Sequence, residues 1–415
     1  MRKASAERAQ TGRWELVGLL WVAFFLNQAD RQVYNVVLPL IGADLSLSSA
    51  ELGLVASAFS LIYGLLVPVA GIVGDRLDRG RVVALSLVVF SLGTSLTGFA
   101  SSFILLMLFR GIATGAGEAF YAPAATSLIA EEHEETRGRA LALHQTANYT
   151  GIVLGSLLSG WIGQTYGWRV AFLMYGAAGL LWSVVLARRL RRHRSSPRAS
   201  PMVTAPKPSL GEALRLVLTT PALLGQLLAF GGLVFVIVGF LTWSPTLLFE
   251  RFGLSLAEAG FSAVFYHHAL AYVGVVAAGW FTDRAIRTYP RARLLVMAFG
   301  LAASGPCIWW AAGSETLTQM LIGFALFGLF RGAYDAGIFA AIFDLVEDRL
   351  RASVTGLVLA SGFVIGAASP TIMGLMKADH GLEGGLRLLA VTSVVAGAIL
   401  AISTAMPPIT NTTRR

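Results

Sequence analysis

Gly71-Ile-Val-Gly-Asp75-Arg76-Leu-Asp78-Arg79-Gly80-Arg81 is the stretch that decides the fold, because the other half of the chain carries a second version of it. The second version reads Gly279-Trp-Phe-Thr-Asp283-Arg284-Ala-Ile-Arg287, with Gly, Asp and Arg at the same spacing. Each stretch directly follows a long apolar segment. A repeat of this kind predicts two halves with the same architecture.

The chain is too apolar for a soluble globular protein. Of its 415 residues 55% are hydrophobic and only 13% are charged, whereas charged residues make up about a quarter of a soluble domain. Apolar segments of about 20 residues can cross the hydrocarbon layer of a membrane, and the backbone must be helical there. The sequence therefore predicts an all-α membrane protein with twelve transmembrane helices: 16–41, 52–74, 82–100, 103–129, 140–163, 168–187, 221–249, 260–282, 293–312, 316–343, 354–376 and 386–406.

The basic residues are distributed according to the two sides of a membrane. Most of the 32 Lys and Arg lie in the N-terminal segment, the C-terminal tail and the loops after every second span. Because Lys and Arg mark the cytoplasmic side, both termini are predicted to be cytoplasmic. Membrane orientation also accounts for the net charge of +9, so no nucleic-acid partner is expected.

One long loop divides the predicted spans into two groups of six. It covers residues 188–212 and combines an arginine cluster with several prolines. This composition predicts a flexible cytoplasmic linker. The expected domains are an N-terminal six-helix bundle, 1–187, and a C-terminal six-helix bundle, 213–415.

The two loop elements, the twelve spans and the long central loop together resemble the Major Facilitator Superfamily. This resemblance implies two pseudo-symmetric six-helix bundles that expose a central site alternately to each side of the membrane. It also implies that the loop residues Asp75, Arg76, Asp283 and Arg284 form a cytoplasmic gate.

Ionisable side chains inside the spans indicate the candidate site, because a charge in the bilayer is costly unless it has a partner or a function. Asp30 and Arg31 lie in the middle of the first span, and Arg110 and Glu118 lie in the fourth. Arg31 is expected to clamp a substrate carboxylate with its planar guanidinium; the alternative is a structural pair with Glu118. Asp30 and Glu118 are expected to carry a coupled proton. The further candidates for substrate binding are Asn27, Tyr34, Arg110, Tyr121, His144 and Asn148.

Two stretches of sequence indicate which branches of the superfamily the chain resembles. Asn27-Gln28-Ala29-Asp30-Arg31 resembles a span-one element of the anion:cation symporters, which carry hexuronates and other sugar acids. Gly115-Ala116-Gly117-Glu118-Ala119-Phe120-Tyr121-Ala122-Pro123 resembles both that group and the spinster-like lipid transporters. In those families the span-four Arg lies seven residues before the Glu. Arg110 lies eight before Glu118, which rotates the pair apart by about 80° in a regular helix.

Other polar groups in the spans leave alternatives open. Arg331 and Asp335 stand four residues apart in span ten and are expected to neutralise each other. His144 suits a proton relay and a hydrogen-bonded buried histidine equally well. His267 and His268 in span eight cannot both face a pore, and no third ligand nearby supports a metal site. Small residues in span five, from Gly151 to Gly160, predict close helix packing.

These observations predict a secondary transporter that couples protons to the uptake of a small organic anion by alternating access. The alternative is an exporter of a lysolipid-, sphingolipid- or drug-like amphiphile. The sequence lacks His-Glu-x-x-His, Gly-x-Ser-x-Gly and a phosphate-binding Gly-Lys-Ser/Thr loop, so no enzyme activity and no cofactor are expected. We expect a monomer in a bacterial inner membrane, in contact with its substrate, protons and lipid.

Overall fold

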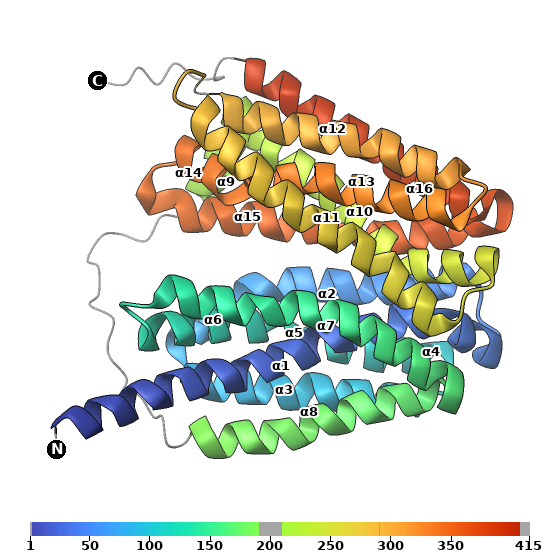
Figure 1. The fold of residues 1–415 in the computed structure, drawn as a ribbon, viewed down its shortest axis with the longest axis horizontal. Helices are drawn as coiled ribbons and strands as arrows, with labels where there is room; N and C mark the ends of the chain where they lie inside the picture. Colours follow the sequence, from blue (N-terminus) through green and yellow to red (C-terminus); the bar gives the residue numbers. More distant parts are fainter. Residues whose placement is uncertain (1, 191–209, 290, 407–415) are drawn as a thin grey trace. The chain divides into compact units, whose positions relative to one another are not determined.

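The computed structural model describes residues 2–190, 210–289 and 291–406, and these ranges contain helices but no strand (Figure 1). The helices of the first half are α1 (Arg2–Leu45), α2 (Ser49–Arg76), α3 (Arg79–Thr97), α4 (Phe103–Leu106), the π-helix η1 (Met107–Thr114), α5 (Gly115–Ala119), α6 (Tyr121–Glu132), α7 (Arg137–Tyr166) and α8 (Trp168–Leu190). Those of the second half are α9 (Leu210–Thr219), α10 (Pro221–Phe252), α11 (Leu256–Ala285), α12 (Ala292–Gly313), α13 (Leu317–Asp335), α14 (Ile338–Leu345), α15 (Asp348–Gly366) and α16 (Ala368–Ala405).

The described residues form two compact units. The first contains the residues up to 190 together with Gly253–Phe261, and the second contains residues 210–252 and those from 262 onward. Within the predicted linker, 188–212, α8 continues to Leu190 and α9 begins at Leu210, while residues 191–209 lie outside the described residues. The predicted domain boundaries therefore stay a prediction.

Nine helical stretches of the described chain are long and apolar enough to cross a membrane by length and composition. The longest, Asp348–Ala405, contains the last two predicted spans, and Gly381 divides them with a non-helical φ of 65° and ψ of 176°. Helices α1 and α7 do not belong to the nine, since each carries several polar side chains among its apolar ones, Asn27 to Asn35 in the first and His144 to Asn148 in the second.

Three predicted spans are divided into shorter helices. Span four, 103–129, is divided into α4, η1, α5 and α6. Span ten, 316–343, turns at Ala336 and Gly337 between α13 and α14, because α13 closes with hydrogen bonds from these two residues. Span eleven, 354–376, is interrupted at Ala367, three residues before Pro370, because the proline has no N–H to offer the Gly366 carbonyl oxygen and its ring crowds that carbonyl.

Close packing of α7 on α1 fixes the middle of the first span. A Cβ atom at Gly155 would lie 2.5 Å from the Cα of Ala29, and one at Gly151 would lie 2.7 Å from the carbonyl oxygen of Phe25. No larger residue fits at either place without moving a backbone. The predicted close approach of span five is confirmed, and it holds the backbone directly before Asp30 and Arg31 in place.

Candidate functional site

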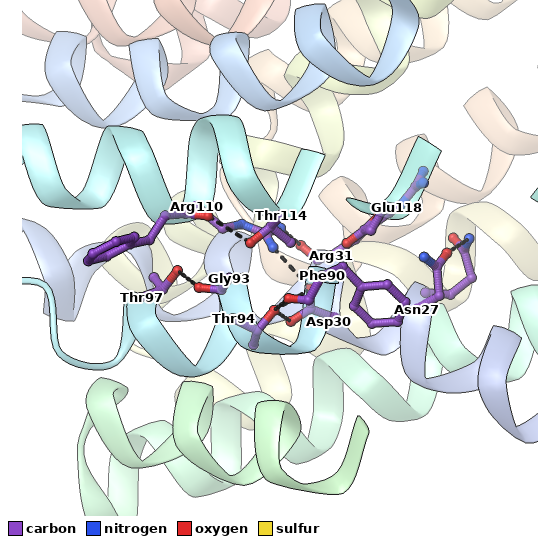
Figure 2. A network of polar contacts seen from close by, with 12 residues as sticks. Asn27, Asp30, Arg31, Phe90, Gly93, Thr94, Thr97, Arg110, Thr114 and Glu118 are labelled. Carbon is purple, nitrogen blue, oxygen red and sulfur yellow. Dashed lines mark hydrogen bonds and ion pairs between the residues drawn. The ribbon is translucent and has the colours of Figure 1, made fainter. Parts of the chain in front are cut away.

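Four charged side chains from α1, η1 and α5 meet inside the first unit (Figure 2). Arg31 Nε donates to Glu118 Oε2 at 2.5 Å, and Arg110 Nη1 donates to Asp30 Oδ2 at 3.2 Å. A second Arg110 nitrogen, Nη2, donates to the Arg31 carbonyl oxygen at 3.3 Å. The group is electrically balanced, with two positive and two negative side chains, so each charge has the partner that a low-dielectric interior requires.

The two ion pairs differ in exposure. Arg110 and Asp30 have side chains only 3% and 2% exposed, whereas the side chain of Arg31 is 21% exposed. Glu118 is fully buried, and its second oxygen, Oε1, has no hydrogen-bond partner among the residues that the structure describes. Arg31 is therefore the charge of this group that a solute can reach, and Glu118 is the carboxylate held behind it.

Thr94 on α3 is a site residue that sequence reasoning missed. Its hydroxyl oxygen lies 2.9 Å from both carboxylate oxygens of Asp30 and 2.9 Å from the Phe90 carbonyl oxygen (Figure 2). A hydroxyl has one hydrogen to donate, so it serves one of these acceptors at a time. The only signal in the sequence is a neutral polar residue in an apolar span, which is common in membrane helices.

Aromatic rings from α2 face the two arginines. The Arg31 guanidinium carbon lies 4.3 Å from the centre of the Tyr63 ring, and that of Arg110 lies 4.7 Å from the centre of the Phe59 ring. Such contacts stabilise a cation by about 0.5–2 kcal/mol, depending on how far it is desolvated. Because a ring face does not neutralise the charge, Arg31 stays able to attract an anion.

The π-helix η1 corrects the expected rotation of Arg110 away from Glu118. A π-helix bonds over five residues instead of four, so it accommodates one more residue than an α-helix along the same path. The Thr114 hydroxyl donates to the carbonyl oxygen of Phe109, five residues earlier, at 2.8 Å. The eight-residue spacing thus behaves like the seven-residue spacing of a regular helix, and both side chains reach the ionic group.

This geometry predicts that deleting Ile112 will leave the protein folded and active. Ile112 is exposed, and its loss would turn η1 into a regular helix with Arg110 seven residues before Glu118. The matched control deletes Leu92, which is also exposed but lies in the regular helix α3. That deletion turns Thr94 by about 100° and should abolish transport. Substrate uptake and thermal melting check both variants; equal damage by the two deletions would contradict the assignment.

The predicted residues Asn27 and Tyr34 flank the ionic group on α1. Both are buried, and Asn27 accepts a hydrogen bond from Gln28 Nε2 at 2.9 Å, while its own Nδ2 has no hydrogen-bond partner within the described ranges. The Tyr34 hydroxyl donates to the Leu52 carbonyl oxygen at 2.7 Å, and its ring centre lies 5.7 Å from the Arg110 guanidinium carbon. Tyr34 thus ties α1 to α2 and packs beside the site.

Tyr121 and His144 form a separate buried group. The Tyr121 hydroxyl donates to the Leu20 carbonyl oxygen at 2.5 Å and lies 3.4 Å from His144 Nε2. The His144 ring stacks on Phe24, with centres 4.7 Å apart. Asn148 is half-buried one turn further along α7. These contacts join Tyr121 and His144 to α1 and not to the four charges, so their predicted role in binding stays a prediction.

The predicted gate residues lie at helix ends. Arg76, Asp283 and Arg284 are exposed, and the Arg284 guanidinium carbon lies 3.9 Å from the centre of the Trp280 ring; the side chain of Asp75 lies outside the described residues. Arg79, which is not one of the predicted gate residues, forms an ion pair with Glu131 at the end of α6. The gate itself stays a prediction.

The second unit contains the predicted ion pair of span ten and the two histidines of span eight. Arg331 Nη2 lies 2.9 Å from Asp335 Oδ2, which confirms the expected pair on α13. His267 is buried and His268 is half-buried on α11. In the ranges that the structure describes, no three His, Cys, Asp or Glu residues are grouped so that they could hold a metal ion.

These features define a class of protein. Apolar helices in two units, with balanced charges inside one of them, are the architecture of a multi-pass membrane transporter. Residues 20–317 match the Major Facilitator Superfamily, and the chain belongs to this family.

Two relatives and one solved structure are similar over most of the chain. The hexuronate transporter of Bacillus subtilis (strain 168) is 25% identical over 380 residues, covering 89% of this chain and 89% of that protein. The probable galactarate/D-glucarate transporter GudP of the same organism is 25% identical over 414 residues, covering 92% and 90%. A bacterial homolog to the human lysosomal transporter Spinster, inward-facing and unoccupied, superposes with a TM-score of 0.77 at 23% identity, covering 95% of this chain and 96% of that chain. Fold and relatives are those of transporters, not enzymes.

Proposed function

We propose that the protein is a proton-coupled symporter of a sugar acid, working by alternating access in a bacterial inner membrane with both termini cytoplasmic. The observation that carries the proposal is the pairing of a reachable Arg31 with a fully buried Glu118, whose Oε1 has no hydrogen-bond partner in the described part of the chain. The two relatives named above, a hexuronate transporter and a probable galactarate/D-glucarate transporter, support a sugar acid as the substrate class.

Competition for Arg31 provides the coupling. While Glu118 is ionised it occupies the guanidinium, and a substrate carboxylate would add a second negative charge to the same donor. Protonation of Glu118 removes the negative charge that holds it to the Arg31 guanidinium. The substrate carboxylate then replaces Glu118 as the anionic partner of Arg31. Release of the proton restores the original pair and expels the anion. One proton that moves inward with one monocarboxylate carries no net charge, so the pH difference across the membrane drives uptake, by about 1.4 kcal/mol per pH unit.

Two buried polar atoms without partners suit a hydroxylated acid. Asn27 Nδ2 is a donor and Glu118 Oε1 is an acceptor, and both belong to the helices that form the ionic group. A sugar hydroxyl can accept from one kind of group and donate to the other. Simple aliphatic acids would leave such groups unsatisfied, which costs about 1–3 kcal/mol for each.

Uptake into proteoliposomes tests the proposal. With the outside more acidic than the inside, vesicles containing the protein should accumulate labelled galacturonate above the external concentration, and a protonophore should abolish the accumulation. Empty vesicles are the control. If acid outside instead drives efflux of a preloaded amphiphile, the exporter reading replaces ours; the likeness to the Spinster homolog concerns the fold alone and does not decide between them.

Replacing Arg31 by Lys should raise the KM for galacturonate by about tenfold, equivalent to about 1.4 kcal/mol. Lysine keeps the positive charge but presents a point charge in place of the planar donor fork. Arg139→Lys is the matched control, because Arg139 is an exposed arginine of the same unit. KM values from initial uptake rates test whether Arg31 binds the substrate. An unchanged KM in Arg31→Lys would show that Arg31 does not belong to the binding site.

A further inference from the structure

An exposed cluster of arginines lies at the end of α11 and in the turn that leads to α12. Arg284 is in the last turn of α11, Arg287 is in the connecting turn, and Arg291 directly precedes α12. All three side chains are exposed, and within the described ranges none of them forms an ion pair with a carboxylate. The neighbouring Asp283 is exposed as well, so three positive charges stand beside a single negative one.

The first half of the chain uses the corresponding arginine differently. Arg79 and Arg287 occupy the same place in the two copies of the repeated loop element, and Arg79 forms an ion pair with Glu131 at the end of α6. In the second half, the acid near the end of α14 is Asp344, which accepts from Arg293 Nε at 2.9 Å. Among the described residues, Arg287 therefore lacks the internal partner that its counterpart has, and its charge faces outward.

Trp280 places this arginine cluster at the boundary of an apolar surface. The Arg284 guanidinium carbon lies 3.9 Å from the centre of the Trp280 ring, and Trp280 is 63% exposed. The ring face orients the flat guanidinium without neutralising its charge. Since exposed tryptophan in membrane proteins is enriched where the hydrocarbon meets the headgroups, we expect the cluster to lie at headgroup level.

Exposed apolar side chains lead to the cluster along both helices. They follow one another every four residues: Tyr272, Val276 and Trp280 on α11, and Leu295 and Phe299 on α12. Residues four apart share a helix face, so the first series continues into Arg284 and the second begins at Arg291. A phospholipid offers the same order of groups, an apolar chain followed by a charged headgroup.

We propose that the arginine cluster binds the phosphate of an anionic phospholipid. Arg287 and Arg291 donate to the phosphate oxygens, whose geometry matches the planar guanidinium, and Arg284 adds its charge from the face of Trp280. The acyl chains lie along the two apolar series. The excess of positive charge favours a headgroup with net negative charge over a zwitterionic one. This site belongs to the second unit and does not require the proposed symport.

Native mass spectrometry of the purified full-length protein measures how much of it carries one lipid. Dioleoyl phosphatidylglycerol should bind at least about tenfold tighter than dioleoyl phosphatidylcholine, and a double variant, Arg287→Gln with Arg291→Gln, should lose most of this preference. Arg284 stays unchanged because it is also a predicted gate residue. The matched control replaces Arg139 and Arg188 by Gln, two exposed arginines of the first unit, and should bind phosphatidylglycerol like the wild type.

Three results would overturn the site. The first is equal binding of the two lipids by the wild type, and the second is an unchanged preference in the double variant. The third is an equal loss in the Arg139 and Arg188 control, which would reduce the effect to a general attraction by positive charge. The exposed side chains of the double variant should leave the melting temperature without lipid unchanged, so lost binding is not lost folding.

Inorganic phosphate separates the lipid from its headgroup chemistry. It should not displace phosphatidylglycerol at an equal concentration, because the apolar series contribute to binding of the lipid alone. Displacement would show that phosphate is recognised without its acyl chains and would overturn the assignment to a lipid. These measurements do not involve galacturonate uptake, so failure of this site and failure of the proposed function are distinguishable.

Discussion

Replacing Glu118 by Gln should abolish proton-driven accumulation of galacturonate and leave exchange of galacturonate across the same membrane intact. Glutamine keeps the shape and still accepts from Arg31 Nε, but it neither binds nor releases a proton. Arg31 is then permanently available to the substrate carboxylate, so loaded carriers can still cycle. We expect accumulation to fall to the external concentration, a loss of about tenfold for each unit of the pH difference, since one proton moving with one monoanion is driven by that difference, about 1.4 kcal/mol per unit.

Two assays on the same vesicles separate these activities. Uptake driven by an acidic exterior measures coupling, and exchange of labelled for unlabelled galacturonate without a gradient measures binding and translocation. Glu135→Gln, at an exposed glutamate of the same unit, should match the wild type in both. If Glu118→Gln still accumulates substrate, Glu118 is not the proton carrier; if it fails to fold, its role is structural.

Replacing Arg110 by Met should destabilise the folded protein by about 3–5 kcal/mol, because it leaves the buried carboxylate of Asp30 without its charged partner. Thr94 alone donates one hydrogen to that carboxylate. Methionine fills much of the arginine volume, so the loss is mainly electrostatic. Thermal unfolding in detergent measures the effect as a lower melting temperature.

A double variant shows whether the unpaired charge of Asp30 causes the loss of stability in Arg110→Met. Adding Asp30→Asn to Arg110→Met removes the orphaned charge and should recover much of the lost stability, as a buried pair exchanged for neutral groups costs little. Arg349→Met is the surface control, because Arg349 pairs with Glu212 and Glu347 at exposed positions, and such pairs contribute about 0–1 kcal/mol. No recovery in the double variant would mean that Arg110 stabilises the protein by packing.

The sequence located most of the ionic group because charges in apolar spans are conspicuous. Asp30, Arg31, Arg110 and Glu118 stand out for this reason alone, and all four meet. The all-helical fold followed from the apolar segments, and the repeat around Asp75 and Asp283 indicated the family.

Partners and helix breaks were harder to predict. Thr94 pairs with Asp30 across 64 residues, and one threonine in a span gives no sign of a distant partner. The break at Ala367 has a signal in the sequence, Pro370, whereas the turn at Ala336–Gly337 depends on how the surrounding helices pack, which a single apolar run does not encode. The relative orientation of Arg110 and Glu118 was mistaken because the angle per residue was taken as constant through η1.

The π-helix η1 in the fourth span also determines how this sequence should be aligned with those of its relatives. Where a relative has one residue fewer between the corresponding Arg and Glu, the gap belongs within Met107–Thr114. An alignment without that gap shifts every position on one side by one, and a homology-based reconstruction would then put Phe109 or Gly111 where Arg110 stands. An extra residue at this place is absorbed within η1, so the residues on either side of it keep the orientation that the site requires.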